Sequence, residues 1–305
     1  MTLLTKLMDE IASSSKHSVA VAAAADSAVL EAVSLALEKN LATFKLFDDQ
    51  TRLDEVIRNE FPHLSGHPDI EIHHTDSPKQ AAEAAVKSIS GNEANVLMKG
   101  HIPTAELLKA VLNAEYGLRT GNVLCHVAAF EIEGYDRLIF ITDAGMNIEP
   151  DLKQKAQIIQ NAVHIARSTG VDMPIVAPLA AVEVVNPNMQ ATLDAAALTV
   201  MNLRGQIKDC IVDGPLALDN AISVKAAAHK GITGDNAGQA DILLVPNIEA
   251  GNILYKSLVY FAKAKVGGVI AGAKVPIVLT SRADSAESKL FSLALAIRSS
   301  NQKAR

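Results

Sequence analysis

Short apolar runs rich in Val, Ile and Leu alternate with longer segments of helical periodicity along most of the chain. The apolar runs lie at 18–24, 42–47, 94–98, 137–142, 209–214, 241–246 and 276–280. A helical segment follows each run, and in the first of these Val29, Val33 and Leu37 recur every four positions. Continuous apolar strands separated by helices are typical of parallel sheets that are covered on both faces. The pattern therefore predicts an α/β fold with doubly wound, mainly parallel sheets.

Three local features refine this prediction. Residues 123–141 contain two apolar runs around Glu-Gly-Tyr-Asp, which indicates a hairpin and hence an antiparallel pair beside the parallel strands. Gly117, Gly170 and Gly231 end helical segments, where we expect left-handed caps. Residues 1–15 have a charged helical pattern, so we expect a helix there and not a signal peptide.

Small, flexible and polar residues gather where the predicted strands end. They are Lys99, Gly100, His101, Thr104, Asp143, Gly145, Asn147, Asp213, Gly214, Pro215, Asn247, Gly251, Asn252, Ser281 and Arg282. In doubly wound sheets, ligands bind beyond the carboxyl ends of the strands, so we expect a site near these residues. Helix capping would account for Thr104 and Ser281, but it does not account for Lys99, Lys256 or Arg282.

An arginine stands where the last strand pattern passes into the last helix pattern. Ser281, Asp284 and Glu287 suit a helix start, because their oxygens accept the free backbone N–H groups. Arg282 is unfavourable beside the partial positive charge of a helix start unless an anion lies between them. We therefore expect an anion-binding site here, and an ion pair of Arg282 with a carboxylate is the alternative.

Composition narrows the possible partners. A composition of 49% hydrophobic and 20% charged residues favours a sizeable core. A length of 305 residues suits two domains, with one large α/β domain as the alternative. A net charge of −6 without a long Lys/Arg run argues against a nucleic-acid partner. No uncharged apolar run approaches the ~20 residues that span a bilayer, so we expect no membrane partner and a cytoplasmic location.

Cys125 and Cys210 do not have the spacing of a pair of metal ligands, and we expect both to be reduced thiols.

The sequence lacks several cofactor and nucleophile motifs. No Gly-x-Gly-x-x-Gly follows the first strand and no P-loop occurs, which argues against nicotinamide cofactors and P-loop nucleotides. His-Glu-x-x-His and Gly-x-Ser-x-Gly are also absent, and the adjacent His73 and His74 would point to opposite sides of an extended segment. We therefore expect no bound metal and no bound cofactor.

Five segments, in their order along the chain, carry a family resemblance. They are KGHIPTAELLKAVL (99–112), DAGMNIEP (143–150), DGPLALDNA (213–221), AGNILYK (250–256) and TSRADSAESK (280–289). Together they resemble the phosphate acetyl/butyryltransferase family from residue 94 onward. The runs SRADSAES and VLCHVAAF resemble the phosphate butyryltransferase branch more than the acetyl branch.

The resemblance implies reversible transfer of a short-chain acyl group, such as butyryl, between CoA and phosphate. CoA would be a substrate, and acyl-CoA and phosphate would be the small-molecule partners. The resemblance also implies a homodimer of subunits with two α/β domains and a cleft between them. The first domain would comprise residues 1–125 and 278–305, and the second would comprise residues 126–277.

The resemblance assigns roles to individual residues. Arg282 would clamp phosphate with a bidentate fork, and Ser281 would hydrogen-bond the transferring group. The acetyltransferase relatives carry an aspartate base where this chain has Ser288, so Glu287 or Asp284 would replace it, with Glu287 preferred. Both carboxylates are alternatively simple helix-start acids. The expected substrate-binding residues are Lys99, Thr104, Arg137, Asp143, Asn147, Gly251, Asn252 and Lys256.

Two other functions are compatible with the sequence. A non-catalytic sensor of acyl-CoA or acyl phosphate would fit the missing aspartate, whereas Ser281 and Arg282 favour catalysis. A metal- and NAD-dependent dehydrogenase of related fold would need grouped metal-binding aspartates. The choice of butyryl as the acyl group depends only on the resemblance to the phosphate butyryltransferase branch.

Overall fold

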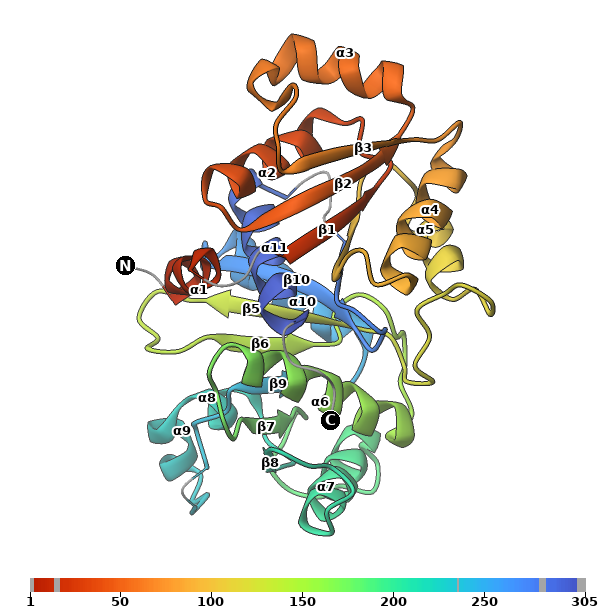
Figure 1. The fold of residues 1–305 in the computed structure, drawn as a ribbon. Helices are drawn as coiled ribbons and strands as arrows, with labels where there is room; N and C mark the ends of the chain where they lie inside the picture. The colour runs from red at the N-terminus through yellow and green to blue at the C-terminus, as the bar shows by residue number, and fades with distance from the viewer. Residues whose placement is uncertain (1–2, 14–16, 235, 280–283, 301–305) are drawn as a thin grey trace. The chain divides into compact units, whose positions relative to one another are not determined.

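The structure, a computed structural model, describes residues 3–13, 17–234, 236–279 and 284–300. The chain forms two compact units (Figure 1). Unit 1 comprises Met1–Asn122 with Gly267–Lys303, and unit 2 comprises Val123–Val266. Each unit is an α/β layer structure, which confirms the predicted fold class.

Unit 1 is built on a mainly parallel sheet. Its strands lie in the order β3-β2-β1-β4-β11-β10. They are β1 (His17–Ala22), β2 (Ala42–Asp48), β3 (Ile70–His74), β4 (Val96–Lys99), β10 (Lys265–Ala271) and β11 (Ile277–Val278). Only the β10–β11 pair among these is antiparallel within the described residues. The carboxyl ends of β1, β2 and β4 therefore meet at one edge.

Helices cover both faces of the unit 1 sheet (Figure 1). They are α1 (Leu3–Ala12), α2 (Ser27–Glu38), α3 (Gln50–Glu60), α4 (Pro78–Ser90), α5 (Thr104–Val111) and α11 (Ala286–Ser300), with the short 3₁₀ helix η1 (Pro62–Leu64). Helix α11 packs against α1 and α2, whereas α4 packs against α5. Helix α2 begins where Asp26 accepts hydrogen bonds from the N–H groups of Ala28 and Val29. Its apolar face, which includes Leu30 and Val33, is fully buried.

The strands of unit 2 lie in the order β5-β6-β9-β7-β8. Its strands are β5 (Cys125–Glu131), β6 (Ile139–Thr142), β7 (Ile175–Pro178), β8 (Ile211–Val212) and β9 (Ile242–Leu244). Strands β5 and β6 are antiparallel, and β6 is parallel to β9, which confirms the predicted hairpin beside parallel strands. The first residues of β5 consequently lie beside the carboxyl end of β6.

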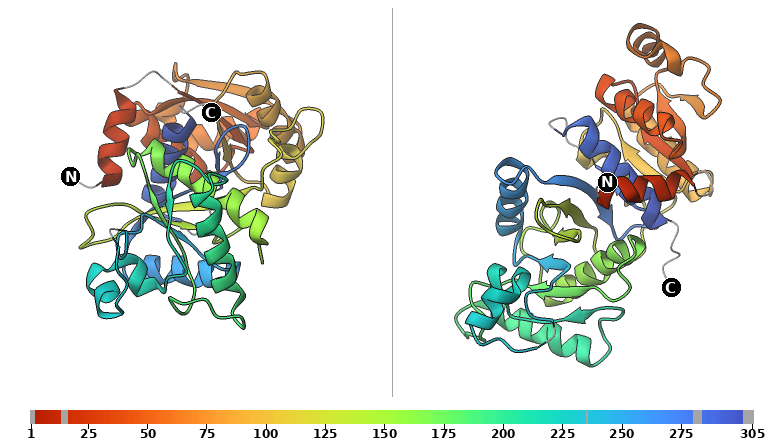
Figure 2. Two further views of the ribbon diagram at one scale, coloured as in Figure 1. Left: turned by 90° about the horizontal axis from the view of Figure 1, so that it is seen from below. Right: turned by 90° about the vertical axis from the view of Figure 1, so that its left-hand side faces the viewer.

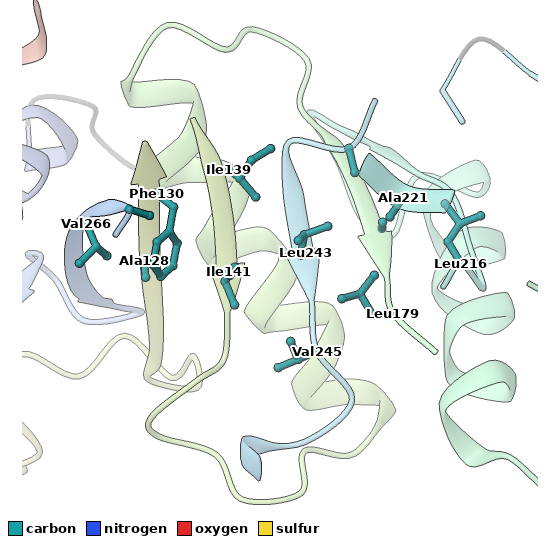
Figure 3. Close-up of a cluster of buried hydrophobic side chains, with 13 residues drawn as sticks. Ala128, Phe130, Ile139, Ile141, Leu179, Leu216, Ala221, Leu243, Val245 and Val266 are labelled. Atoms are coloured by element: carbon teal, nitrogen blue, oxygen red, sulfur yellow. The ribbon is translucent and has the colours of Figure 1, made fainter. Parts of the chain in front are cut away.

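Helices also cover both faces of the unit 2 sheet. They are α6 (Leu152–Ser168), α7 (Gln190–Leu203), α8 (Leu218–Ile222), α9 (Val224–His229) and α10 (Ile248–Tyr260). Figure 2 shows α6 and α10 on opposite sides of the strands. Phe130, Ile141 and Leu243 form part of a buried apolar cluster (Figure 3), against which Leu254 and Leu258 of α10 pack. Burial of each such side chain contributes about 1.5–3 kcal/mol, so α10 is fixed on this face.

Two local predictions need correction. Gly170 and Gly231 have φ of 101° and 71° after their helices, as predicted, but Gly117 does not have a left-handed conformation. Helix α5 ends at Val111, and a Cβ on Gly117 would lie 2.3 Å from the Asn113 oxygen, so close packing requires this glycine. The single helix expected after residue 216 is split, because Ser223 ends α8 and caps α9.

Candidate active site

The carboxyl edge of the unit 1 sheet brings the Lys-Gly-His segment against the end of β1. The N–H groups of Gly100 and His101 donate to the oxygens of Ala22 (2.8 Å) and Ala23 (2.7 Å). A Cβ on Gly100 would lie 1.9 Å from the Ala23 oxygen, so only glycine permits this approach. His101 Nδ1 lies 3.0 Å from Asp26 Oδ2. A histidine and a carboxylate thus meet at this edge.

Two other predicted residues of this edge have different surroundings. Lys99 Nζ donates to the backbone oxygens of Gly100 (3.0 Å) and Ile102 (3.1 Å), which places its charge beside the loop that follows β4. Thr104 is exposed as the first residue of α5, and the N-cap position belongs to Pro103. Capping therefore does not account for Thr104, and its hydroxyl is open to solvent.

The start of α11 is described from Asp284 onward. Ser281 and Arg282 lie outside the described residues, so their predicted roles stay predictions. Ser285 Oγ accepts from the N–H of Ser288 at 3.1 Å, which caps the helix. Glu287 is an exposed acid of the first turn, where it complements the helix dipole. Its position is open to a substrate as well as to solvent.

The loop after β6 is organised by Asp143, which is only 2% exposed. Its Oδ1 accepts from the N–H groups of His126 (3.2 Å), Gly145 (2.9 Å) and Met146 (3.0 Å). Its Oδ2 accepts from the backbone N–H and the side-chain Nδ2 of Asn147 at 3.1 and 2.5 Å. Asn147 Nδ2 also donates to the Leu124 oxygen at 2.8 Å. These bonds hold the loop in one shape beside the start of β5.

Helix α10 approaches this loop through a glycine. A Cβ on Gly251 would lie 2.8 Å from both the Asp143 oxygen and Val245 Cγ2, so a larger residue would push the helix away. Asn247 caps α10 by accepting from the Ala250 N–H at 3.0 Å. Asn252 and Lys256 are exposed and lie one helical turn apart, which puts them on the same face of α10. That face can offer an amide and an ammonium group to an anion.

The strand-end segment after β8 lies beside the end of β7. A Cβ on Gly214 would lie 3.0 Å from Pro178 Cδ, which explains a small residue at this position. Asp213 is half-buried, and burial raises the pKa of its carboxyl group above the usual range. A carboxyl group with a raised pKa holds its proton more readily than an exposed one.

Within unit 2, Arg137 does not lie at the carboxyl edge with the predicted residues Asp143 and Asn147. Arg137 precedes β6, so it lies at the amino end of the strand that Asp143 follows. Its Nε is 3.6 Å from Asp241 Oδ1, and its Nη2 donates to the Ala240 oxygen at 3.5 Å. These contacts indicate a structural role at the opposite edge of the sheet.

Sequence reasoning did not single out His126 at the carboxyl edge of unit 2. Its register partner is Asp143, because Val127 lies opposite Thr142 in the antiparallel β5–β6 pair. The available signal was a histidine within the otherwise apolar run VLCHVAAF. The sequence pattern shows the histidine but not its neighbours, so it does not place His126 beside Asp143 at the carboxyl end of β6.

The described residues contain no group of three potential metal ligands. His63 and His67 are four positions apart in sequence, but His63 bonds to Ser34 Oγ and His67 accepts from the Asp69 N–H. The dehydrogenase alternative would need metal-binding aspartates, and an Asp-Asn-Ala tripeptide does occur at 219–221. Asp219 is exposed on α8, however, and its Oδ1 accepts a hydrogen bond from the Asn220 N–H. Neither the histidine pair nor Asp219 belongs to a group of three potential metal ligands within the described residues.

The two cysteines are free and buried. Burial raises the pKa of the Cys125 thiol and of the Cys210 thiol to about 12. Both are therefore protonated at neutral pH and poor nucleophiles. Among the helices of the described chain, none has the length and apolarity that crossing a bilayer would require.

Comparison with known proteins decides the family. The family model described as phosphate acetyl/butaryl transferase matches residues 55–297. The chain belongs to this family. It is 57% identical over 300 residues to a probable phosphate butyryltransferase of Bacillus subtilis, covering 97% of this chain and 99% of that protein. It is 51% identical to a phosphate butyryltransferase of Clostridium beijerinckii, covering 96% and 97% of the two chains.

A solved structure agrees with this assignment. The crystal structure of a branched-chain phosphotransacylase from Enterococcus faecalis aligns with a TM-score of 0.82 and 38% identity. The alignment covers 93% of this chain and 99% of that one. The family likeness therefore extends to the arrangement of helices and strands.

Proposed function

We propose that this protein catalyses reversible transfer of a short-chain acyl group between CoA and inorganic phosphate. The observation that carries the proposal is family membership over most of the chain, with relatives named as phosphate butyryltransferases. Butyryl-CoA is the proposed substrate for the same reason. The described site chemistry is compatible, because polar residues and glycines lie at the carboxyl ends of strands in both units.

The reaction needs an anion site, a polarised carbonyl and a base for the CoA thiol. We assign phosphate to Arg282 and the amides at the start of α11, with Ser281 bonding the transferring group. Glu287 is the proposed base, and Asp284 is the second choice. The acyl carbon is already activated in either substrate, so CoA acts as a substrate and the proposal includes no bound cofactor or metal.

Other residues are proposed to bind the remaining parts of the substrates. Asn252 and Lys256 offer exposed polar groups on α10, and Thr104 offers an exposed hydroxyl group on α5. Lys99 is half-buried at the end of β4, where its ammonium group lies beside the following loop. Asp143, Asn147 and Gly251 are proposed to act by shaping the loop and helix beside the substrate.

The proposal also covers assembly and location. We propose a cytoplasmic homodimer in which each compact unit is a folding domain. Within the described residues, all exposed large apolar side chains except Leu112 belong to unit 2, among them Leu203 (77% exposed) and Phe261 (87% exposed). Such a distribution favours unit 2 as the source of the dimer contact.

The test is release of CoA thiol from butyryl-CoA by the purified protein, with and without phosphate. We expect phosphate-dependent release without nicotinamide or added metal. Tight binding of acyl-CoA without turnover would instead identify a sensor. Turnover of a hydroxy acid that requires both NAD and a divalent ion would identify a dehydrogenase.

A further inference from the structure

Unit 1 has a hollow of about 590 Å³ at the outer edge of its strands. It lies beside α3 and β3, which pack against each other at one end of the unit (Figure 1). Its lining residues all belong to unit 1, and those from β3 lie among the first three residues of that strand. The candidate active-site residues, in contrast, follow the carboxyl ends of strands. Cavities that hold small molecules commonly measure about 300–1,000 Å³, so this hollow has room for a separate ligand.

The floor of the hollow is aliphatic. Ile57 and Leu64 are 4% and 2% exposed, and Ile70 and Ile72 are half-buried. Because alternate residues of a strand share one face, Ile70 and Ile72 present their side chains on the same side of β3. An aliphatic group that enters the hollow exchanges water for this apolar surface. The floor therefore favours a ligand with a branched or straight hydrocarbon part.

The rim of the hollow carries an acid and a base from α3. Asp54 and Arg58 both line the hollow and lie four positions apart, so they share one face of the helix. An acid four positions before a base is the favourable order for an ion pair. Within the described part of the chain, however, neither side chain forms an ion pair or a hydrogen bond. Asp54 is half-buried and Arg58 is exposed, so both charges can meet a ligand.

The loop between η1 and β3 adds a second donor. His67 lines the hollow and is half-buried. Its Nδ1 accepts from the Asp69 N–H at 3.1 Å, so the neutral imidazole carries its proton on Nε2. The hollow thus offers two donors, the Arg58 guanidinium and the His67 Nε2–H, and one carboxylate acceptor, Asp54. A ligand that satisfies all three has an anionic and a cationic group.

We propose that this hollow binds a free α-amino acid with an aliphatic side chain. Its carboxylate accepts from Arg58 and His67, its ammonium group donates to Asp54, and its side chain contacts the aliphatic floor. A simple carboxylate would leave Asp54 facing a like charge, and a simple amine would do the same to Arg58, so a zwitterion fits best. The site is additional to the proposed transferase reaction and does not depend on it.

Binding of L-leucine to the purified full chain, measured by isothermal titration calorimetry, tests this inference. We expect saturable binding at one site per chain. Two analogues each lack one charge, since 4-methylpentanoate has no ammonium group and 3-methylbutylamine has no carboxylate. Each analogue should bind at least about tenfold more weakly than leucine, because it loses charge-assisted hydrogen bonds. Glycine, which has no side chain to contact the floor, should also bind more weakly.

Two substitutions assign the charges of the ligand to their partners. Arg58→Gln should weaken leucine binding at least about tenfold, but it should not weaken binding of 3-methylbutylamine, which has no carboxylate. Asp54→Asn should weaken leucine binding to a similar extent without weakening 4-methylpentanoate. Arg52→Gln and Glu55→Gln change exposed residues of α3 that do not line the hollow, and these matched controls should bind leucine like the wild type.

Melting temperatures without ligand show whether each variant is folded, and the analogue series on the wild type tests the inference without any variant. Absence of leucine binding at concentrations up to about 10 mM would overturn it. Equal affinity for 4-methylpentanoate would do so as well, because the hollow would then be a simple anion site. Leucine binding that is unchanged in both substitutions would place the ligand elsewhere. Thiol release from butyryl-CoA is measured separately, so failure of the proposed function is distinguishable from failure here.

Discussion

Individual side chains at the strand ends divide into those that hold the loops and those that are open to a substrate. Both oxygens of Asp143 accept hydrogen bonds from its own loop and from β5, so its effect on a substrate would pass through the loop shape. Asn252, Lys256 and Glu287 are exposed and can contact a ligand directly. This distinction depends on hydrogen-bond partners, which residue type alone does not give.

Replacement of Arg282 tests the anion site. Arg282→Ala should weaken phosphate use by at least about tenfold, since a charge-assisted hydrogen bond contributes about 1.5–3 kcal/mol. Arg282→Lys should restore little, because a point charge cannot form the bidentate contact. Steady-state kinetics against phosphate measure both effects, with the melting temperature as the control. An alanine variant with wild-type phosphate kinetics would reject the assignment.

The two carboxylates at the start of α11, Glu287 and Asp284, are predicted to differ in their contribution to the reaction rate. Glu287→Gln should preserve the helix, since the two residues have similar helix propensity, but should lower kcat by about 10²- to 10⁴-fold. Asp284→Asn should change stability by only about 1 kcal/mol and leave most activity. The dependence of kcat on pH distinguishes an enzymic base from attack by free CoA thiolate. Two active variants whose rates rise with pH toward the thiol pKa would show that no enzymic base is used.

The pH dependence of stability is predicted to include a contribution from His17. Burial lowers the pKa of His17, because the charged imidazolium is poorly solvated at its 6%-exposed position. The neutral form is therefore favoured in the folded protein. Its contribution to stability is complete above the ordinary histidine pKa of about 6.5 and is lost as pH falls below it. The melting temperature of His17→Leu should fall less between pH 7.5 and 5.5 than that of the wild type; an equal fall would contradict this prediction.

At the scale of elements, the sequence pattern predicted most of the buried strands but missed β3, β7 and the mostly buried β10. Strands β2 and β9 are apolar runs, so their burial was evident from residue type. Strand β3 contains Glu71 and two histidines, and β7 is short and ends at Pro178, so neither has a clear strand pattern. The split between α8 and α9 arises because the Ser223 side chain caps the second helix, which competes with a continuous helix.

The candidate site was predictable to the extent that it depends on strand direction. Residues that follow parallel strands lie at the carboxyl edge of those strands, so chain order alone placed Lys99 at the end of β4 and Asp143 and Asn147 after β6. The close approach of Gly251 to Asp143 involves two segments far apart in sequence, and it is evident only from the folded structure. Arg137 was grouped with the others, although the structure puts it at the opposite end of β6.

The packing of α10 on the β6 loop gives a stability prediction. Gly251→Ala places a Cβ 2.8 Å from the Asp143 oxygen, and we expect a loss of about 1–3 kcal/mol in unfolding free energy from the forced displacement. Gly145→Ala is the matched control, since its Cβ would make ordinary contacts at 3.7 Å and should change stability by less than about 0.5 kcal/mol. Denaturant unfolding measures both. Equal stability of the two variants would show that α10 adjusts without cost.

At the scale of the whole molecule, the family motifs are distributed over both compact units. The Lys-Gly-His segment and α11 belong to unit 1, whereas the Asp143 loop, the Asp-Gly-Pro segment and α10 belong to unit 2. The borders of these units fall at 122/123 and 266/267, and their status as folding domains stays a prediction. The described residues supply polar side chains, amides and carboxylates, which are the groups that acyl transfer to phosphate requires.

The proposed reaction is tested most directly by the stoichiometry of its products. Protein dialysed against EDTA is mixed with butyryl-CoA and phosphate, and acyl phosphate is followed by ³¹P NMR while free CoA is measured as thiol. Equal amounts of both products are expected, with no nucleotide or metal added, and butyryl phosphate plus CoA should give butyryl-CoA in the reverse direction. CoA release without acyl phosphate, or turnover that requires a divalent ion, would contradict the proposed reaction.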